Sequence, residues 1–147
     1  MRLRAVVDTN VLVGGLLTAD PASPLVAVVD GMLSGRFLFL LSPALVNEYR
    51  AVLHRPKLRP LHGLSEDDIE AVLVELAANG LWRDPERQSA DAGAPDPGDD
   101  HLWDLLRTPE RPVLVTGDQL LLENPPSFAS VLSPRSFVEM GTGSCLP

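Results

Sequence analysis

Short apolar runs alternate with longer amphipathic segments along this chain. Three runs, at residues 5–7, 37–41 and 113–115, have the composition of strands buried on both faces, and weaker runs at 81–83 and 131–132 suggest minor strands. Cap residues, prolines and glycines between these runs predict helices over about 11–17, 24–34, 42–53, 65–79, from Asp99 or Asp100 to just before Pro109, and 133–140. Strands that alternate with helices imply parallel pairing through right-handed crossovers. We therefore expect a three-layer α/β/α sandwich around a central, mostly parallel sheet.

The length of 147 residues fits one domain with a substantial core. We expect a single domain over residues 1–140, a loose C-terminal tail over 141–147, and one long loop in the proline- and glycine-rich stretch 84–98. Cys145 has no second cysteine with which to form an internal disulfide, and this fits a reducing compartment. Because no apolar run reaches membrane-spanning length and no signal-peptide layout is seen, we expect a cytoplasmic protein.

Two acidic residues, Asp8 and Asp118, come after buried runs of the predicted sheet. The carboxyl ends of parallel strands share one edge of a sheet, and ligands bind at that edge. We therefore expect both carboxylates to lie there. The alternative for Asp8 is that it serves as a cap for the helix that follows it.

Further acids lie on or at the start of helices. Glu48 falls on the apolar stripe that Leu45 and Val52 mark on their helix, where a carboxylate is costly unless a cation meets it. Two or three acids crowd the start of a later helix, at Asp96, Asp99 and Asp100. The helix dipole alone also favours acids at that position, so capping is an alternative for each of them.

These acidic positions point to a single metal site. No lysine or histidine is evident to pair with them, and neighbouring carboxylates repel one another unless a cation binds. Oxygen ligands suit Mg²⁺ or Mn²⁺ better than zinc, and such ions assist phosphodiester cleavage. The net charge of −8 argues against a protein that coats polyanions, so a nucleic-acid substrate would need local neutralisation by bound cations.

Four motifs resemble those of PIN domains and occur in the same order: Val-Val-Asp8-Thr-Asn-Val, Ser-Pro-Ala-Leu-Val-Asn-Glu48-Tyr, Asp96-Pro-Gly-Asp-Asp-His and Leu-Val-Thr-Gly-Asp118. The segment that begins at Val131 matches as well. Within that family the chain is similar to VapC-like toxins of type II toxin–antitoxin modules. The resemblance implies a Mg²⁺- or Mn²⁺-dependent endoribonuclease acting on single-stranded or structured RNA, commonly a homodimer, that a small antitoxin protein neutralises.

The resemblance also assigns the site. It makes Asp8, Glu48 and Asp118 metal-binding, catalytic acids, with Thr116 as a neighbour. For the remaining acid, the Asp-Pro-x-Asp pattern selects Asp99, whereas a separation of 18 residues from Asp118 selects Asp100. We favour Asp99 and keep Asp100. The following helix departs from the alanine- and glycine-rich pattern of the family, which leaves this register open.

Several weaker signals accompany the acids. Arg50, Arg55, Lys57 and Arg59, with His54 and His62, form a basic segment that either grips phosphates or is an ordinary solvated connection. Arg36 and Arg111 are expected to be ordinary surface residues. Core packing is favoured over base stacking for Trp82 and Trp103. For His101, which adjoins the acids, a first-turn helix residue without a catalytic part is favoured over a proton shuttle.

Two other functions stay open at this point. One is a catalytically silent PIN-like binding module, which should show no stabilisation by Mn²⁺. The other is a metal-dependent phosphatase with Asp8 as nucleophile. It is weakened because Asn10 stands where a second acid is usual.

Overall fold

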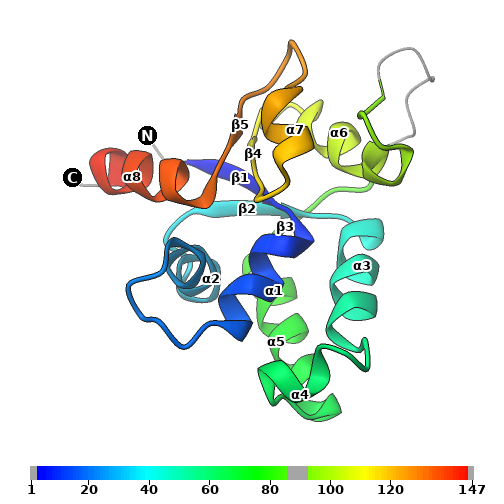
Figure 1. The fold of residues 1–147 in the computed structure, drawn as a ribbon. Helices are drawn as coiled ribbons and strands as arrows, with labels where there is room; N and C mark the ends of the chain where they lie inside the picture. Colours follow the sequence, from blue (N-terminus) through cyan, green and yellow to red (C-terminus); the bar gives the residue numbers. More distant parts are fainter. Residues whose placement is uncertain (1–2, 86–92, 146–147) are drawn as a thin grey trace.

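A five-stranded parallel sheet forms the centre of the protein. The computed structural model describes residues 3–85 and 93–145, without the side chains of 141–145. The strands lie in the order β3-β2-β1-β4-β5, all parallel, and this confirms the predicted sandwich (Figure 1). Their bounds are β1 Arg4–Val7, β2 Leu38–Leu41, β3 Leu81–Trp82, β4 Val113–Val115 and β5 Val131–Leu132.

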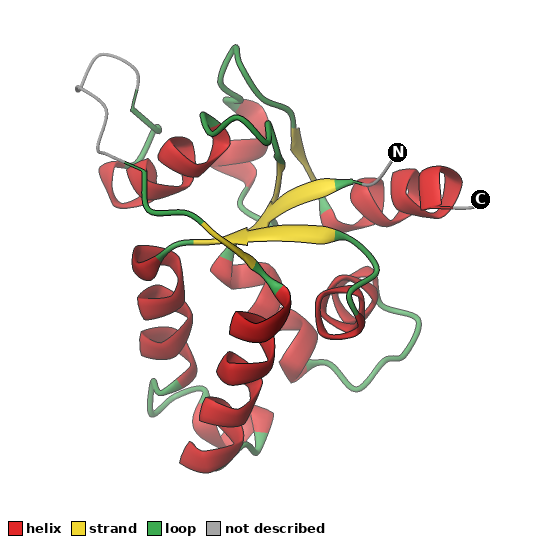
Figure 2. Cartoon of the chain, turned by 180° about the vertical axis from the view of Figure 1, so that it is seen from behind, coloured by secondary structure: helices red, strands yellow, loops and turns green. Residues whose placement is uncertain are grey.

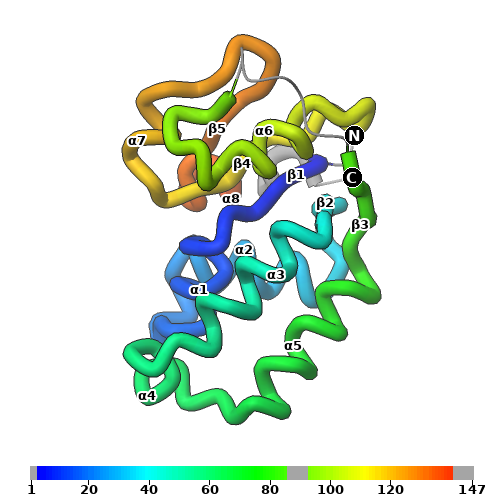
Figure 3. Tube along the Cα trace, turned by 90° about the vertical axis from the view of Figure 1, so that its right-hand side faces the viewer, coloured from blue at the N-terminus to red at the C-terminus, as the bar shows by residue number. Residues whose placement is uncertain are grey.

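Helices cover both faces of this sheet. One face carries α1 Thr9–Leu17, α2 Pro24–Ser34, α3 Pro43–Leu53, α4 Arg59–His62 and α5 Glu66–Asn79, and α8 Pro134–Cys145 packs beside α2. The opposite face carries α6 Asp100–Leu106 and α7 Gln119–Glu123, with a 3₁₀ turn over Pro97–Asp99 directly before α6. Figure 2 shows these layers from behind, and Figure 3 shows α3 and α5 side by side on their face of the sheet.

The predicted helix starts are confirmed at their caps. Ser23 and Ser42 accept hydrogen bonds from backbone amides of the first turn, and a proline follows each of them in the helix. Ser65 and Asp68 form the predicted capping box of α5. Helix α1 begins two residues earlier than predicted, because the Asp8 side chain accepts from the Thr9 amide and caps it.

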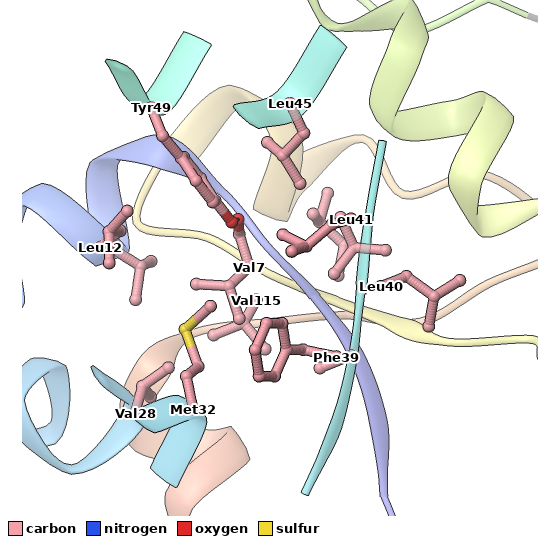
Figure 4. Close-up of a cluster of buried hydrophobic side chains, with 14 of the residues drawn as sticks. Val7, Leu12, Val28, Met32, Phe39, Leu40, Leu41, Leu45, Tyr49 and Val115 are labelled. Carbon is pink, nitrogen blue, oxygen red and sulfur yellow. The ribbon is translucent and has the colours of Figure 1, made fainter. Parts of the chain in front are cut away.

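The core lies mainly between β1, β2, β4 and the large helical layer. Figure 4 shows the Tyr49 hydroxyl pointing at the β1 backbone, where it donates a 2.5 Å hydrogen bond to the carbonyl oxygen of Val7. Gly15 allows α1 and α2 to pack closely, since a Cβ there would lie 2.7 Å from the carbonyl oxygen of Leu25. Gly15 therefore serves the packing of α1 against α2.

Several local predictions differ from the structure. Trp103 is buried as predicted, but Trp82 is 41% exposed, because β3 is an edge strand. The Trp82 indole lies against α5, where it donates to the Ala77 carbonyl oxygen. Helix α4 lies within the basic segment, at residues where no helix was predicted, and α7 was not predicted either. Helix α8 continues five residues past its predicted end at Met140, because the glycines there weaken a helix without breaking it.

The long loop predicted over 84–98 lies partly outside the described residues, at 86–92, and its end forms the 3₁₀ turn. Residues 141–145, expected to belong to a loose tail, are helical, and 146–147 lie outside the described residues. The division into a domain over 1–140 and a tail stays a prediction.

Candidate functional site

The sheet has a topological switch point between β1 and β4. The chain leaves β1 toward β2 on one side and returns to β4 on the other, so the crossovers diverge at the carboxyl ends of these strands. Asp8 follows β1 there, and its amide donates a 2.9 Å hydrogen bond to the Val115 carbonyl oxygen of β4. Asp118 follows β4 at the same edge. The predicted placement of both acids is confirmed.

Hydroxyl and amide groups fix Asp8 relative to Asp118. Thr116 Oγ1 donates to Asp8 Oδ2 at 2.8 Å and accepts from the Asp118 amide at 3.0 Å. Asn10 Nδ2 donates to the same carboxylate oxygen at 3.2 Å, and Asn10 Oδ1 accepts from the Gly117 amide at 2.9 Å. Asn10 therefore ties the turn after β4 to α1. Sequence reasoning gave Asn10 no such role, because its partner Gly117 is 107 positions away.

Glu48 reaches this edge from α3. The Thr9 hydroxyl donates a 2.5 Å hydrogen bond to Glu48 Oε2, and Thr9 directly follows Asp8. His101 of α6 faces the same oxygen, with Nε2 3.7 Å from it. The fold thus brings Glu48 to Thr9, the residue after Asp8, across 39 positions of sequence.

His101 corrects the expectation that no histidine pairs with the acids, whereas its expected lack of a catalytic part stays a prediction. Its side chain is 17% exposed and faces Glu48, and its buried Nδ1 has no hydrogen-bond partner within the described residues. The signal in the sequence was its position directly after two acids at the start of a helix.

Electrostatics shows that the acids act on one another. The pKa of Asp99 is raised to about 6, first by burial and then by the charges of Asp8, Asp96, Glu48 and Asp118. Burial also raises the pKa of Asp8, although its hydrogen bonds oppose this. His101 is the largest cause that lowers the pKa of Glu48, with smaller contributions from Thr9 and from the charge of Arg55. Four carboxylates from four segments therefore share one field.

The two candidates for the remaining acid lie differently. Asp100 Oδ1 accepts a 2.8 Å hydrogen bond from the Ala94 amide, so this side chain anchors the loop before the 3₁₀ turn. Asp99 instead experiences the charges of Asp8, Glu48 and Asp118. Asp99 therefore lies within electrostatic reach of the other three acids, and the choice between Asp99 and Asp100 as a ligand stays a prediction.

The carboxylate oxygens of the four acids are the kind of ligand that a hard divalent cation prefers, but they are not yet arranged around a common point. Within residues 3–85 and 93–145, no group of three or more His, Cys, Asp or Glu side chains is arranged so that it could hold a metal ion as it stands. Asp8 and Glu48 are engaged by neighbouring hydroxyls instead. Burial is the largest cause of the raised pKa of Asp99, and the charges of the neighbouring acids add to it; a bound cation would relieve this repulsion.

Several residues of the basic segment are paired with other groups of the protein. Arg50 forms two 3.1 Å hydrogen bonds with Glu70, and Arg59 lies 3.7 Å from Glu66. The His62 ring contacts the carbonyl oxygen of Leu53 and accepts from the Leu64 amide. Arg55, by contrast, acts electrostatically on Glu48. The arginines of the basic segment therefore differ: Arg50 and Arg59 pair with acids of α5, whereas the charge of Arg55 acts on Glu48.

A family model described as PIN domain matches residues 4–120. The chain belongs to the PIN domain family. The match covers all four acids and ends before β5 and α8. PIN domains are generally nucleases that use divalent metal ions, so a nuclease-type, hydrolytic function is indicated for this chain.

A search of curated proteins gives no match to this PIN domain. In the described part of the chain, no helix has the length and apolar character needed to cross a membrane.

Proposed function

We propose that this PIN domain is a Mg²⁺- or Mn²⁺-dependent endoribonuclease. Asp8, Glu48, Asp99 and Asp118 are the acids that hold the ions. The observation that carries the proposal is their convergence at the switch point between β1 and β4, where the charges of the other three raise the pKa of Asp99. Asp100, whose carboxylate accepts from the Ala94 amide, is not one of the proposed ligands.

The residues of the chain prepare this edge for phosphodiester hydrolysis. Bound divalent ions would activate the attacking water and neutralise charge on the phosphate. Thr116 and Asn10 hold Asp8 in place, and Thr9 holds Glu48. His101 lies next to Glu48 Oε2 and lowers the pKa of Glu48, which favours its ionised form.

The test is cleavage of a mixed pool of single-stranded and structured RNAs, with single-stranded DNA beside it, in Mn²⁺ or EDTA. We expect cleavage of RNA in Mn²⁺, none in EDTA, and a loss of about a hundredfold or more in Asp118→Ala. Asp30→Ala is the matched control, because Asp30 is an exposed acid on α2, away from the site. Retained cleavage by pure Asp118→Ala protein contradicts the proposal, and preferential cleavage of DNA contradicts its RNA specificity.

A catalytically silent binding module remains the second candidate, because the acids do not already form a metal cage. Thermal unfolding separates the two functions. The nuclease proposal requires Mn²⁺ to raise the melting temperature of the wild-type protein, since an ion that binds the native state stabilises it. No rise, together with no cleavage, supports the silent module.

We further propose that the nuclease is the toxin of a type II toxin–antitoxin module, working in the cytoplasm as a homodimer with a small antitoxin partner. The support is the resemblance of its motifs to VapC-like toxins. Induced expression should arrest bacterial growth, and co-expression of the neighbouring reading frame should relieve the arrest. Expression of the Asp118→Ala variant should leave growth unaffected. Light scattering on the purified protein tests the dimer.

A further inference from the structure

A second concave surface lies beyond the C-terminal end of α6. This cavity has a volume of about 760 Å³, and its lining residues come from the α6–β4 connection and the α7–β5 connection. Arg107, Thr108 and Arg111 line it from the first connection, and Ser127 and Phe128 line it from the second. Its lining includes two arginines and no carboxylate residue, although the chain carries a net charge of −8. The cavity therefore suits an anionic ligand.

Arg111, which lines this cavity, has a strained backbone conformation. Its φ angle is 49°, and among the described residues it is the one non-glycine residue with a positive φ. The Arg111 amide donates to the Thr108 carbonyl oxygen at 3.0 Å and so closes a turn that glycine would adopt without strain. Strained residues persist chiefly where function requires the side chain. Arg111 is exposed, as expected of a surface residue, but its backbone conformation is unusual for one.

Phe128 gives the cavity an aromatic wall. The ring is 40% exposed, and the guanidinium carbon of Arg107 lies 4.6 Å from its centroid. Arg107 also lies 3.6 Å from Asp104, which helps to hold it over the ring. An exposed ring beside a cation is the kind of platform on which a nucleobase stacks.

We propose that this cavity binds a nucleotide of the RNA strand away from the scissile phosphate, with Arg111 contacting a phosphate and Phe128 stacking on a base. The proposal rests on the proposed ribonuclease function. Helix α6 joins the two sites: Asp99 precedes its first residue and Arg107 follows its last. Its seven residues span about 10 Å, so a few nucleotides bridge the distance.

The test measures the binding of a labelled single-stranded RNA of about a dozen nucleotides by fluorescence anisotropy in Ca²⁺. A gel shows that the RNA stays intact. We expect Arg111→Ala and Phe128→Ala each to weaken binding about tenfold. Arg111→Ala should also lower the slope of log Kd against log salt by about 0.7, the value for one phosphate contact on a single strand. Arg36→Ala is the control, because Arg36 is an exposed arginine outside the cavity.

Arg111→Gly separates a functional arginine from a structural one. It should weaken RNA binding as much as Arg111→Ala does, while raising the melting temperature by about 2 °C through relief of the backbone strain. Higher stability with unchanged binding overturns the inference, as does an equal loss of binding in Arg36→Ala.

Cleavage assays on the same proteins distinguish this inference from the proposed function. If the wild-type protein cleaves RNA and neither cavity variant changes Kd or KM, the inference fails and the ribonuclease stands. If the wild-type protein binds RNA through the cavity but cleaves nothing in Mn²⁺, the ribonuclease fails and the cavity stands.

Discussion

Thr116 Oγ1 donates a 2.8 Å hydrogen bond to Asp8 Oδ2, and both residues are buried at the ends of neighbouring strands. The same hydroxyl accepts from the Asp118 amide at 3.0 Å. One side chain therefore sets the position of Asp8 relative to the backbone of Asp118, although 108 positions separate Thr116 from Asp8.

Thr116→Val removes this hydroxyl at nearly constant volume. We expect cleavage to fall by about 10- to 100-fold, as is typical when a group that orients a metal ligand is lost. The free energy of unfolding in EDTA should fall by about 1–3 kcal/mol, because the Asp8 carboxylate loses one of its two 2.8 Å hydrogen bonds. Thr116→Ser keeps the hydroxyl and should retain most of both properties. Equal activity of the two variants would show that the hydroxyl does not orient Asp8.

Asp99→Asn and Asp100→Ala separate the two neighbouring acids. Asp99→Asn should lower cleavage by about a hundredfold or more. In EDTA the same substitution should raise the melting temperature, because it removes repulsion from Asp8 and Glu48. Asp100→Ala should lower the melting temperature through loss of the Ala94 contact and leave the Mn²⁺-dependent stabilisation in place. The opposite pattern would make Asp100 the ligand.

Stability without metal should depend on pH through Asp99. Its pKa is about 6 in the folded protein against an ordinary value of 3.8, so the native state binds more protons between these values. The free energy of unfolding should therefore fall as the pH rises from about 4 to about 6. Urea unfolding in EDTA across this interval measures the slope, which Asp99→Asn should flatten. An unchanged slope in the variant would assign the effect to other groups.

Arg55→Ala tests whether the basic segment meets substrate. Its charge acts on Glu48, so a phosphate near the acids should interact with it. We expect KM for RNA to rise about fivefold with little change in kcat, and the effect to shrink at high salt. Arg50→Ala is the matched control, since Arg50 is paired with Glu70 on an exposed surface and should change KM little. Equal effects of the two variants would indicate only a general loss of positive charge.

Local chemistry was enough to predict much of this fold. The strand cores are continuous apolar runs, and Ser42 and Ser65 begin α3 and α5 because their side chains cap the first turn. Once the strands are parallel, the place of Asp8 and Asp118 at one edge follows from topology. Helix α7 escaped prediction because it is short, although Asp118 caps it with an ordinary side-chain hydrogen bond.

By itself, the sequence determined the order of strands and helices and the acids at the strand ends, because both depend on contacts between residues near in the chain. The tertiary structure decided that Asp99 experiences the charges of Asp8, Glu48 and Asp118, which arginines are paired with acids of α5, and that His101 faces Glu48. These outcomes depend on side chains from separate elements meeting in space. Local spacing does not encode such meetings, because they arise from how the helices pack on the sheet.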